Sequence, residues 1–306
     1  EGFLPVTFDN LSSGHRWAVK WGPLVEGDML DLQALREVFR QHRFSAVMHF
    51  AAKIEVGESV REPLLYYRNN VVGTLNLLDA MRDAEIDRLV FSSTAAVYGI
   101  PEYTPIDEDH PTRPINPYGW SKVMAERAIA DACQAHGLRA VCLRYFNAAG
   151  ADAEGEIGEA HEPESHLIPN IIKAALNPEL GPVKIFGNDY PTPDGTCVRD
   201  YVHVEDLCEA HLKALDYMER NPGFGAFNIG TERGWSVMEV LRACQERTGG
   251  EPVSQIEPRR PGDVPVLVAD GSRARELLDA APASTLGQIM ASALLWHERA
   301  HEAELS

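Results

Sequence analysis

The first half of the chain alternates short apolar runs with longer segments of helical periodicity. Apolar runs at residues 44–50, 88–92 and 139–144 predict strands that are buried on both faces. Between them, apolar residues recur every three or four positions in residues 63–86, and residues 118–136 are rich in Ala, Glu and Arg, so both segments predict helices. Strands that alternate with helices in this way are typical of a doubly wound α/β fold with a parallel sheet.

The pattern becomes less regular after Gly150. Residues 151–165 are rich in Gly, Glu and Ala and predict a loop. Helices are expected at residues 168–175 and from Glu205 onward, and a strand is expected at residues 226–229. The second half therefore reads as a smaller α/β unit.

Composition and charge exclude several classes of protein. The 306 residues carry a formal net charge of −18 at pH 7, which argues against a nucleic-acid partner because phosphate backbones attract clustered Lys and Arg. No apolar run reaches the ~20 residues that a membrane helix needs, so no membrane partner is expected. The five cysteines are odd in number and form no C-x-x-C motif. They favour reduced thiols in a cytoplasmic protein, and we expect neither a disulfide framework nor a metal site.

Tyr118 and Lys122 form a candidate catalytic pair. They stand four residues apart and therefore share one face of the predicted helix, which Asn116 could cap and whose first position suits Pro117. A neighbouring ammonium favours the phenolate and lowers a tyrosine pKa from its usual value near ~10. Such a pair can take a proton from an alcohol, although the spacing alone often arises by chance.

The loop at residues 92–99 gives that pair a context. It is rich in hydroxyl groups and follows a predicted parallel strand, where the ligands of open α/β sheets bind. Thr94 would place a hydroxyl there, within reach of a substrate oxygen. A capped turn is the simpler explanation of the loop, but the Tyr118 helix that follows favours a functional role.

Strand ends in the first half predict a dinucleotide site. Asp9 and Asn10 close an apolar run, and an acidic residue at such a place accepts hydrogen bonds from the adenine ribose of NAD and disfavours NADP. Small residues near other strand ends would let a flat cofactor approach the backbone. The further candidates at strand ends are Asp28, Met29, Phe50 and Ala51.

Eight segments of the chain resemble those of UDP-glucose 4-epimerases, which belong to the extended short-chain dehydrogenase/reductase family. They occur in the family's order and spacing from about Asp9 to about Asp270, and the segment at residues 186–207 is highly specific. The segments read HFAAKIEVGES, SSTAAVYG, NPYGWSK, LRYFNAAGA, HLIPN, FGNDYPTPDGTCVRDYVHVEDL, FNIGT and RRPGD.

The resemblance implies a reaction, the reversible epimerisation of a UDP-hexose at C4 between UDP-glucose and UDP-galactose. Tyr118, as a phenolate, would take the proton of the 4-hydroxyl while bound NAD accepts the hydride from the same carbon. The resulting 4-keto sugar would turn over and be reduced on its other face. Thr94 stands where the family has a catalytic Ser or Thr, and Lys122 would bind the nicotinamide ribose.

The resemblance also implies binding residues and a partner. Arg199 and Arg260 suit a diphosphate on chemical grounds as well. Asn69 and Phe146 match positions near the cofactor and the sugar. The helices at residues 63–86 and 118–136 match those that pair in family homodimers. The positions that match those holding the UDP part are Asn147, His166, Leu167, Phe186, Arg199, Arg260 and Asp263.

We therefore expect two domains. Residues 1–150 would form an NAD-binding Rossmann domain, and residues 151–306 a UDP-sugar-binding domain that is partly interleaved with the first.

Family members open with a strand and a G-x-x-G-x-x-G loop that binds the NAD pyrophosphate, and the sequence contains no such motif. We expect that about 25–30 residues of a βαβ unit are missing before Glu1. The chain as given should then fold poorly and bind NAD weakly.

Three alternative functions remain at this stage. A nucleotide-sugar 4,6-dehydratase is disfavoured, because that group has Asp-Glu after the threonine where this chain has Ala95 and Ala96. An inactive fragment or pseudoenzyme is compatible with the missing glycine motif. A UDP-pentose 4-epimerase also remains, because a single hydroxymethyl group distinguishes its substrate from a hexose. A UDP-N-acetylhexosamine 4-epimerase remains as well, since Leu267 stands where some members have a Tyr that narrows the sugar pocket.

Overall fold

The computed structural model describes residues 2–250, 253–260 and 262–305, so Pro261 of the family-like RRPGD segment lies outside the described residues. The described chain packs into two compact units that interleave along the sequence. Unit 1 comprises the described residues of Glu1–Ile100, Pro111–Arg144 and Ala214–Phe227. Unit 2 comprises those of Pro101–His110, Tyr145–Lys213 and Asn228–Ser306. The roles that we predict for the two halves of the chain stay a prediction.

The strands of unit 1 form two sheets in the part of the chain that the structure describes. In the first, β1 (Thr7–Asp9) pairs in parallel with β2 (Leu24–Glu26). The second has the order β3–β4–β5–β9, and β3 and β4 are parallel, with His49 opposite Phe91. Its strands are β3 (Val47–His49), β4 (Arg88–Thr94), β5 (Arg139–Tyr145) and β9 (Phe224–Ile229).

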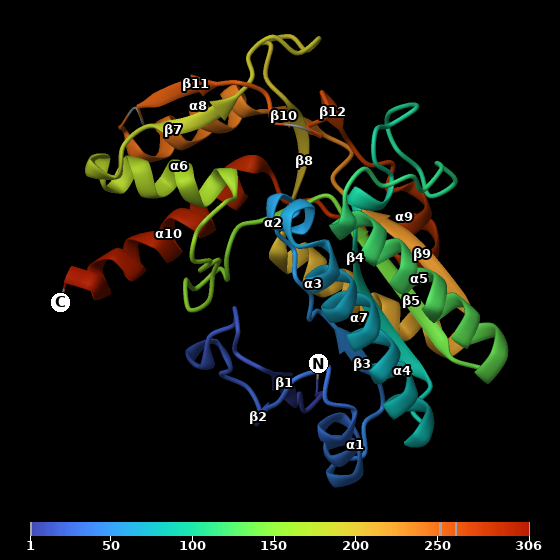
Figure 1. Ribbon diagram of the computed structural model, residues 1–306. Coiled ribbons are helices and arrows are strands. Elements are labelled where there is room, and N and C mark those ends of the chain that lie inside the picture. The colour runs from blue at the N-terminus through green and yellow to red at the C-terminus, as the bar shows by residue number, and fades with distance from the viewer. Residues whose placement is uncertain (1, 251–252, 261, 306) are drawn as a thin grey trace. The chain divides into compact units, whose positions relative to one another are not determined.

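The interiors of β4 and β5 are almost continuously buried, as a sheet that is covered on both faces requires. One apolar cluster joins β4 and β5 to α1, α4 and α5 through residues such as Leu35, Leu77, Phe91 and Ile129. Figure 1 shows α3, α4 and α5 side by side. The helices of unit 1 are α1 (Leu32–Gln41), α2 (Val56–Arg61), α3 (Pro63–Tyr66), α4 (Gly73–Asp83) and α5 (Pro117–His136), with 3₁₀ turns η1 (Arg16–Ala18) and η3 (Ala95–Val97).

The predicted helix at residues 63–86 is present but not uniform. Between α3 and α4 the chain forms a π-helical stretch, η2 (Tyr67–Val72). Such stretches are rare and often lie at functional sites, and this one carries Asn69. Asn70 beside it is buried, and its side-chain amide donates to the Ser121 hydroxyl at 2.9 Å and to the Lys53 carbonyl at 3.0 Å.

The central strand of unit 2 is β8 (Val198–His203), which pairs with β10, β12 and β6. Its pairing with β10 is antiparallel, and its pairing with β12 and β6 is parallel. A second ladder joins β7 and β11 in parallel. These partners are β6 (Asn147–Ala149), β7 (Val183–Phe186), β10 (Gly234–Ser236), β11 (Ser254–Glu257) and β12 (Val266–Leu267).

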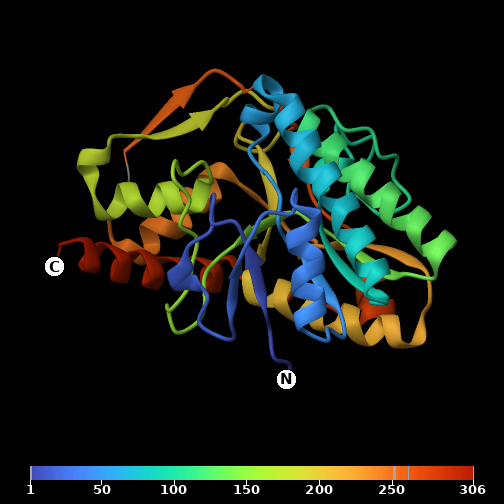
Figure 2. The ribbon, with the colours of Figure 1, turned by 60° about the horizontal axis from the view of Figure 1, so that its bottom comes forward.

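The helices of unit 2 bury a separate apolar cluster that includes Ile171, Tyr201, Val240 and Met290. Figures 1 and 2 both show α6 and α10 side by side. None of the helices in the described ranges combines enough length with enough apolar character to span a lipid bilayer. The bounds are α6 (Leu167–Leu176), η4 (Pro178–Leu180), α7 (Val204–Arg220), α8 (Val237–Thr248), α9 (Ser272–Leu278) and α10 (Leu286–Leu305), with the first part of α7 in unit 2.

Candidate active site and nucleotide-binding residues

The start of α5 sets the position of Tyr118 and Lys122. Asn116 caps the helix as predicted, because its side-chain oxygen accepts the Gly119 amide at 2.8 Å. Pro117 occupies the first helical position, where no N–H is needed. Tyr118 and Lys122 therefore lie one turn apart on the same side of α5.

Tyr118 and Thr94 are brought together although they come from different elements. Thr94 ends β4 and accepts the Ala96 amide at 3.1 Å, and its hydroxyl also hydrogen-bonds the Tyr118 phenol. Burial raises the pKa of Tyr118, and the Thr94 hydrogen bond opposes this only in part. The close approach depends on Gly119, because a Cβ there would lie 2.6 Å from the Ala96 carbonyl oxygen.

Lys122 does not act on Tyr118 as the sequence led us to expect. Its ammonium donates to the Ser92 carbonyl at 2.8 Å and lies 4.8 Å from the centre of the Phe91 ring. Burial lowers the pKa of Lys122 to about 8, and the nearby Glu126 carboxylate opposes that shift. The expectation that Lys122 lowers the Tyr118 pKa is therefore wrong in the protein without a bound cofactor. Burial of the phenol has the largest effect on this pKa, and the Lys122 ammonium is directed to the Ser92 carbonyl.

A buried ionic network behind Lys122 was missed by the sequence reasoning. Arg144 on β5 forms two hydrogen bonds to the Glu126 carboxylate on α5, at 3.0 and 2.6 Å. The same guanidinium donates to the Tyr98 hydroxyl at 3.0 Å, and Ser93 donates to Glu126. Both charged side chains are over nine-tenths buried. The network ties α5 to β5 and to β4, the strand that carries both Ser92 and Thr94.

An open pocket of about 100 Å³ in unit 1 gathers six of the residues predicted to hold the cofactor. Asn10 on its wall donates to the Asp28 carboxylate at 2.9 Å. Phe50 is not among the lining residues, and its side chain is 57% exposed. The six predicted residues in the wall are Asp9, Asn10, Asp28, Met29, Ala51 and Asn69, and the others are Phe8, Ser12, Ser13, Gly14, Gly27, Ala52 and Lys53.

The groups in this wall fit the adenosine part of a dinucleotide such as NAD. The carboxylates of Asp9 and Asp28 can accept hydrogen bonds from ribose hydroxyls and would repel an added ribose phosphate. Gly27 brings the wall close to the Phe8 ring, since a Cβ at Gly27 would lie 2.4 Å from that ring. The pocket thus offers hydroxyl acceptors beside a small-residue surface on which a flat group can lie.

Four of the residues predicted to hold UDP come together in unit 2. The Asp263 carboxylate lies 3.7 Å from the Arg199 guanidinium and 3.4 Å from that of Arg260. Arg260 also covers the Phe186 ring at 4.2 Å, and Arg199 donates to the Val264 carbonyl at 2.8 Å. Two guanidiniums and an aromatic ring are therefore held side by side, as the recognition of an anionic, ring-bearing ligand requires.

The remaining residues predicted to hold the substrate also belong to unit 2. Leu267 on β12 pairs with Arg199 in the β8 ladder, and Asn147 on β6 pairs with Tyr201 of the same strand. Phe146 is buried, and its amide donates to the Ile229 carbonyl at 3.4 Å. His166 and Leu167 lie at the start of α6, and the His166 Nδ1 atom is turned toward two carboxylates.

Comparison with known proteins gives this arrangement a family context. The model of the NAD dependent epimerase/dehydratase family matches residues 5–230. A UDP-glucose 4-epimerase of Rhizobium leguminosarum bv. trifolii is 50% identical over 303 residues, which cover 99% of this chain and 92% of that protein.

Two solved structures share the fold. The UDP-glucose 4-epimerase of Brucella ovis, in complex with NAD, is 48% identical with a TM-score of 0.93 and covers 96% of this chain and 90% of its own. That of Bifidobacterium longum, in complex with NAD+ and UDP, is 37% identical, also with a TM-score of 0.93, over 97% of this chain and 92% of its own. The predicted parallel-sheet Rossmann fold with a second α/β domain is thereby confirmed.

Proposed function

The chain belongs to the NAD dependent epimerase/dehydratase family, and from this premise we infer that it is an NAD-dependent enzyme that inverts carbon 4 of the hexose in UDP-glucose. The product of that inversion is UDP-galactose. The observation that carries the inference is the hydrogen bond between Thr94 and Tyr118 at the end of β4, in a chain whose relatives are UDP-glucose 4-epimerases. The similarity supports this function over a fragment without activity.

We assign the proton transfer to Tyr118. Its phenol would take the proton of the sugar 4-hydroxyl and return it when the carbon is reduced again. Thr94 would orient both oxygens, since its hydroxyl already bonds the phenol. NAD, when bound, supplies the reversible hydride acceptor for carbon 4. Ala95 and Ala96 follow Thr94 and have no acidic group, so the chain lacks a proton donor there for the loss of water.

Binding is assigned to the two groups of residues described above. In unit 1, the Asp9 and Asp28 carboxylates would accept the hydroxyls of the NAD ribose, and Lys122 would exchange the Ser92 carbonyl for a hydroxyl of the nicotinamide ribose. In unit 2, the guanidinium groups of Arg199 and Arg260 share the Asp263 carboxylate and would exchange it for a diphosphate. A diphosphate carries more negative charge and offers more acceptor oxygens to two guanidinium groups than one carboxylate does.

Substitution of Tyr118 tests the proposed function. Tyr118→Phe removes the phenol oxygen and keeps the ring, so the conversion of UDP-galactose to UDP-glucose should fall by about 10²–10⁴-fold. Tyr103→Phe is the matched control, because its hydroxyl bonds the exposed Asp107 at 2.7 Å. NAD binding, measured by fluorescence titration, should not change in Tyr118→Phe. An active Tyr118→Phe enzyme would exclude this role.

We also propose that the chain forms a homodimer through the outer faces of the helices beside α5. The exposed apolar side chains of the helical segment before α5 include Leu64, Val72 and Leu75. Trp120 and Met124 on α5 are exposed as well. The helices α2, α3 and α4 pack against α5, so we propose that these side chains contribute to one surface. A continuous apolar surface of this kind is typical of a protein interface.

Sedimentation velocity tests the dimer. Leu64→Glu places a charge on a side chain that is 67% exposed, and it should shift the protein from dimer to monomer. Leu180→Glu on η4 is the control, because that side chain is equally open at 65% and lies in unit 2. A monomeric parent protein, or a dimer that survives Leu64→Glu, would contradict the proposal.

A cytoplasmic location is our further proposal. All five cysteines, each in the described part of the chain, are free thiols, as a reducing compartment maintains them.

A further inference from the structure

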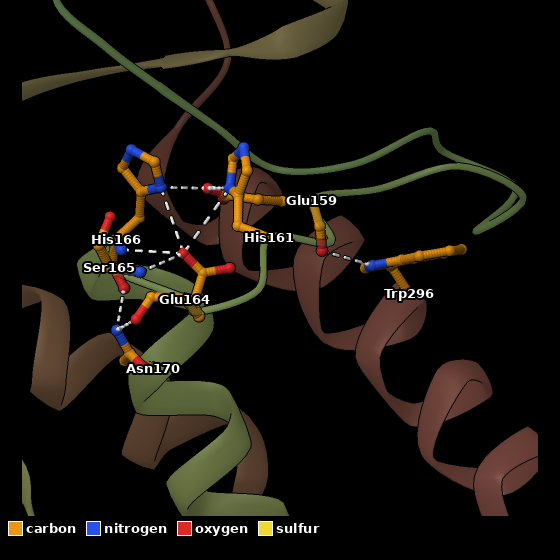
Figure 3. A network of polar contacts seen from close by, with 7 residues as sticks. All are labelled: Glu159, His161, Glu164, Ser165, His166, Asn170 and Trp296. Carbon is orange, nitrogen blue, oxygen red and sulfur yellow. Dashed lines mark hydrogen bonds and ion pairs between the residues drawn. The ribbon is translucent and has the colours of Figure 1, made fainter. Parts of the chain in front are cut away.

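Four side chains from one short segment of unit 2 converge on a common point (Figure 3). They are Glu159, His161, Glu164 and His166, and their potential ligand atoms all lie within 4.8 Å of one another. The Nδ1 atom of His166 lies 2.6 Å from the Glu159 carboxylate and 3.2 Å from that of Glu164. The Nδ1 atom of His161 lies 3.1 and 3.8 Å from the same two oxygens.

We propose that these four residues bind a divalent transition-metal ion, and that zinc fits the site best. Zinc binds imidazole nitrogen and carboxylate oxygen at about 2.0–2.2 Å in tetrahedral sites, which places neighbouring ligand atoms ~3.4 Å apart. The four nitrogen–oxygen separations lie on both sides of that value. Two imidazoles among the ligands disfavour Mg²⁺ and Ca²⁺, which prefer oxygen. The cysteine pattern gave no hint of such a site, because no cysteine takes part.

The buried carboxylate of Glu164 is an independent sign of a ligand. Its side chain is only 5% exposed, and within the described structure its Oε2 atom meets no hydrogen-bond partner. An unpaired carboxylate oxygen in such a place is costly. A cation that is bound by both oxygens of this carboxylate would provide the missing partner of Oε2.

The main alternative is an ion-pair network of two carboxylates and two imidazolium groups. Hydrogen bonds that His161 and His166 donate to the Glu159 and Glu164 carboxylates raise the pKa of His161 to about 9 and that of His166 to about 10. Two protons on the imidazoles carry the same total positive charge as one divalent ion, and both would bind at the same nitrogen atoms. The metal would therefore displace protons from the imidazoles, and a titration with metal distinguishes the two interpretations.

The position of the cluster suggests a structural role. It joins the loop before α6 to His166, the N-cap residue of that helix, because the Glu164 carboxylate also accepts the His166 amide at 2.9 Å. Trp296 on α10 donates its indole N–H to the Glu159 carbonyl at 3.0 Å, as Figure 3 shows. A bound ion would thus fix the loop, the start of α6 and α10 together. The proton chemistry assigned to Tyr118 in unit 1 does not use it.

The test is a metal titration of the 306-residue chain after treatment with a chelator. Isothermal titration with Zn²⁺ should give one ion per chain, with release of protons, and saturation should raise the midpoint of thermal unfolding. Co²⁺ in the same site should give the intense visible absorption of a tetrahedral complex. Absence of stoichiometric Zn²⁺ binding, or tighter binding of Mg²⁺ or Ca²⁺ than of Zn²⁺, would overturn the proposal.

Three variants assign any bound ion to this cluster. His161→Gln and Glu164→Gln should each lose stoichiometric binding and the thermal shift. Glu162→Gln changes an exposed carboxylate of the same segment and should bind like the parent. Because Zn²⁺ could bind the exposed thiol of Cys208 instead, unchanged binding by His161→Gln and Glu164→Gln would refute the assignment. Circular dichroism of each variant before titration confirms that it is folded.

Discussion

At the scale of single residues, the balance between Thr94 and burial sets when Tyr118 can act as a base. Burial raises the Tyr118 pKa and the Thr94 hydrogen bond lowers it. The reactive form is the phenolate, so kcat/KM should rise with pH through the neutral range.

Replacement of Thr94 should move that rise. Thr94→Val removes the hydrogen bond that favours the phenolate, so the Tyr118 pKa rises further and the pH profile shifts to higher pH. Hydrogen bonds to charged groups contribute about 1.5–3 kcal/mol, so activity at pH 7 should fall roughly 10–100-fold. Thr94→Ser keeps the hydroxyl and should keep the profile. A Thr94→Val profile with an unchanged midpoint would refute this account.

His49 makes the fold sensitive to acid. It is buried, it hydrogen-bonds the Thr74 hydroxyl at 3.0 Å, and burial lowers its pKa to about 3, with a further contribution from the Lys122 charge. The unfolded chain binds a proton at His49 below pH ~6.5, whereas the folded chain does not until about pH 3. Stability from this group is therefore present above the unfolded pKa and is lost as pH falls between these values.

Urea unfolding of His49→Gln measures that loss. Between pH 6 and pH 4, the parent should lose up to about 1.4 kcal/mol per pH unit from this one group. The variant should show a shallower dependence, although it is less stable at pH 7.5. The control is His136→Gln, which changes an exposed histidine at the end of α5. Equal slopes for parent and His49→Gln would show that His49 takes up its proton without unfolding.

Single residues also show what the sequence could predict. The shared helix face of Tyr118 and Lys122 could be read from their spacing, and the position of Thr94 at a strand end from the apolar run before it. The direction of the Tyr118 pKa could not, because it depends on burial by residues distant in sequence. The Glu126–Arg144 pair has no local pattern, since its members lie on a helix and a strand 18 residues apart. The close spacing of His161, Glu164 and His166 is visible in the sequence, but the cysteine pattern alone gave no reason to predict a metal site there.

At the scale of elements, the contact between α5 and the end of β4 depends on one glycine. Gly119→Ala would place a Cβ 2.6 Å from the Ala96 carbonyl oxygen and 2.9 Å from Pro114. Since backbone must shift, Tyr118 should move away from Thr94, and activity should fall by about 10²-fold for a displacement near 1 Å. Gly57→Ala on α2 is the control, because its nearest neighbour is the flexible end of Arg61. Full activity of Gly119→Ala would refute the requirement.

Elements were predictable where the local signal was strong. The cap at Asn116 begins α5 and the helix ends at His136, both as predicted. The buried runs of β4 and β5 needed no further information. Helix α8 was missed although Ser236 and Glu239 form a capping box, which is a readable signal. The short strands that pair with β8 could not be foreseen, because residues far apart in sequence stabilise them.

At the scale of the whole molecule, the charge of −18 should make stability depend on salt. Like charges repel in the compact state, and salt screens that repulsion over about 10 Å at 0.1 M. The midpoint of thermal unfolding should therefore rise between low salt and 0.3 M NaCl. KCl at equal ionic strength should give the same shift, because screening does not depend on the cation. A falling midpoint would mean that attractive surface ion pairs dominate.

The interleaving of the two units has a consequence for synthesis on the ribosome. Unit 1 contains residues Ala214–Phe227, and through them most of the edge strand β9. A nascent chain that has emerged only as far as residue 150 still lacks this strand, so its sheet exposes an unpaired border. Completion of the first unit must wait until most of the polypeptide has left the exit tunnel. Slow translation or early release should therefore yield chaperone-bound intermediates rather than an independently folded N-terminal half.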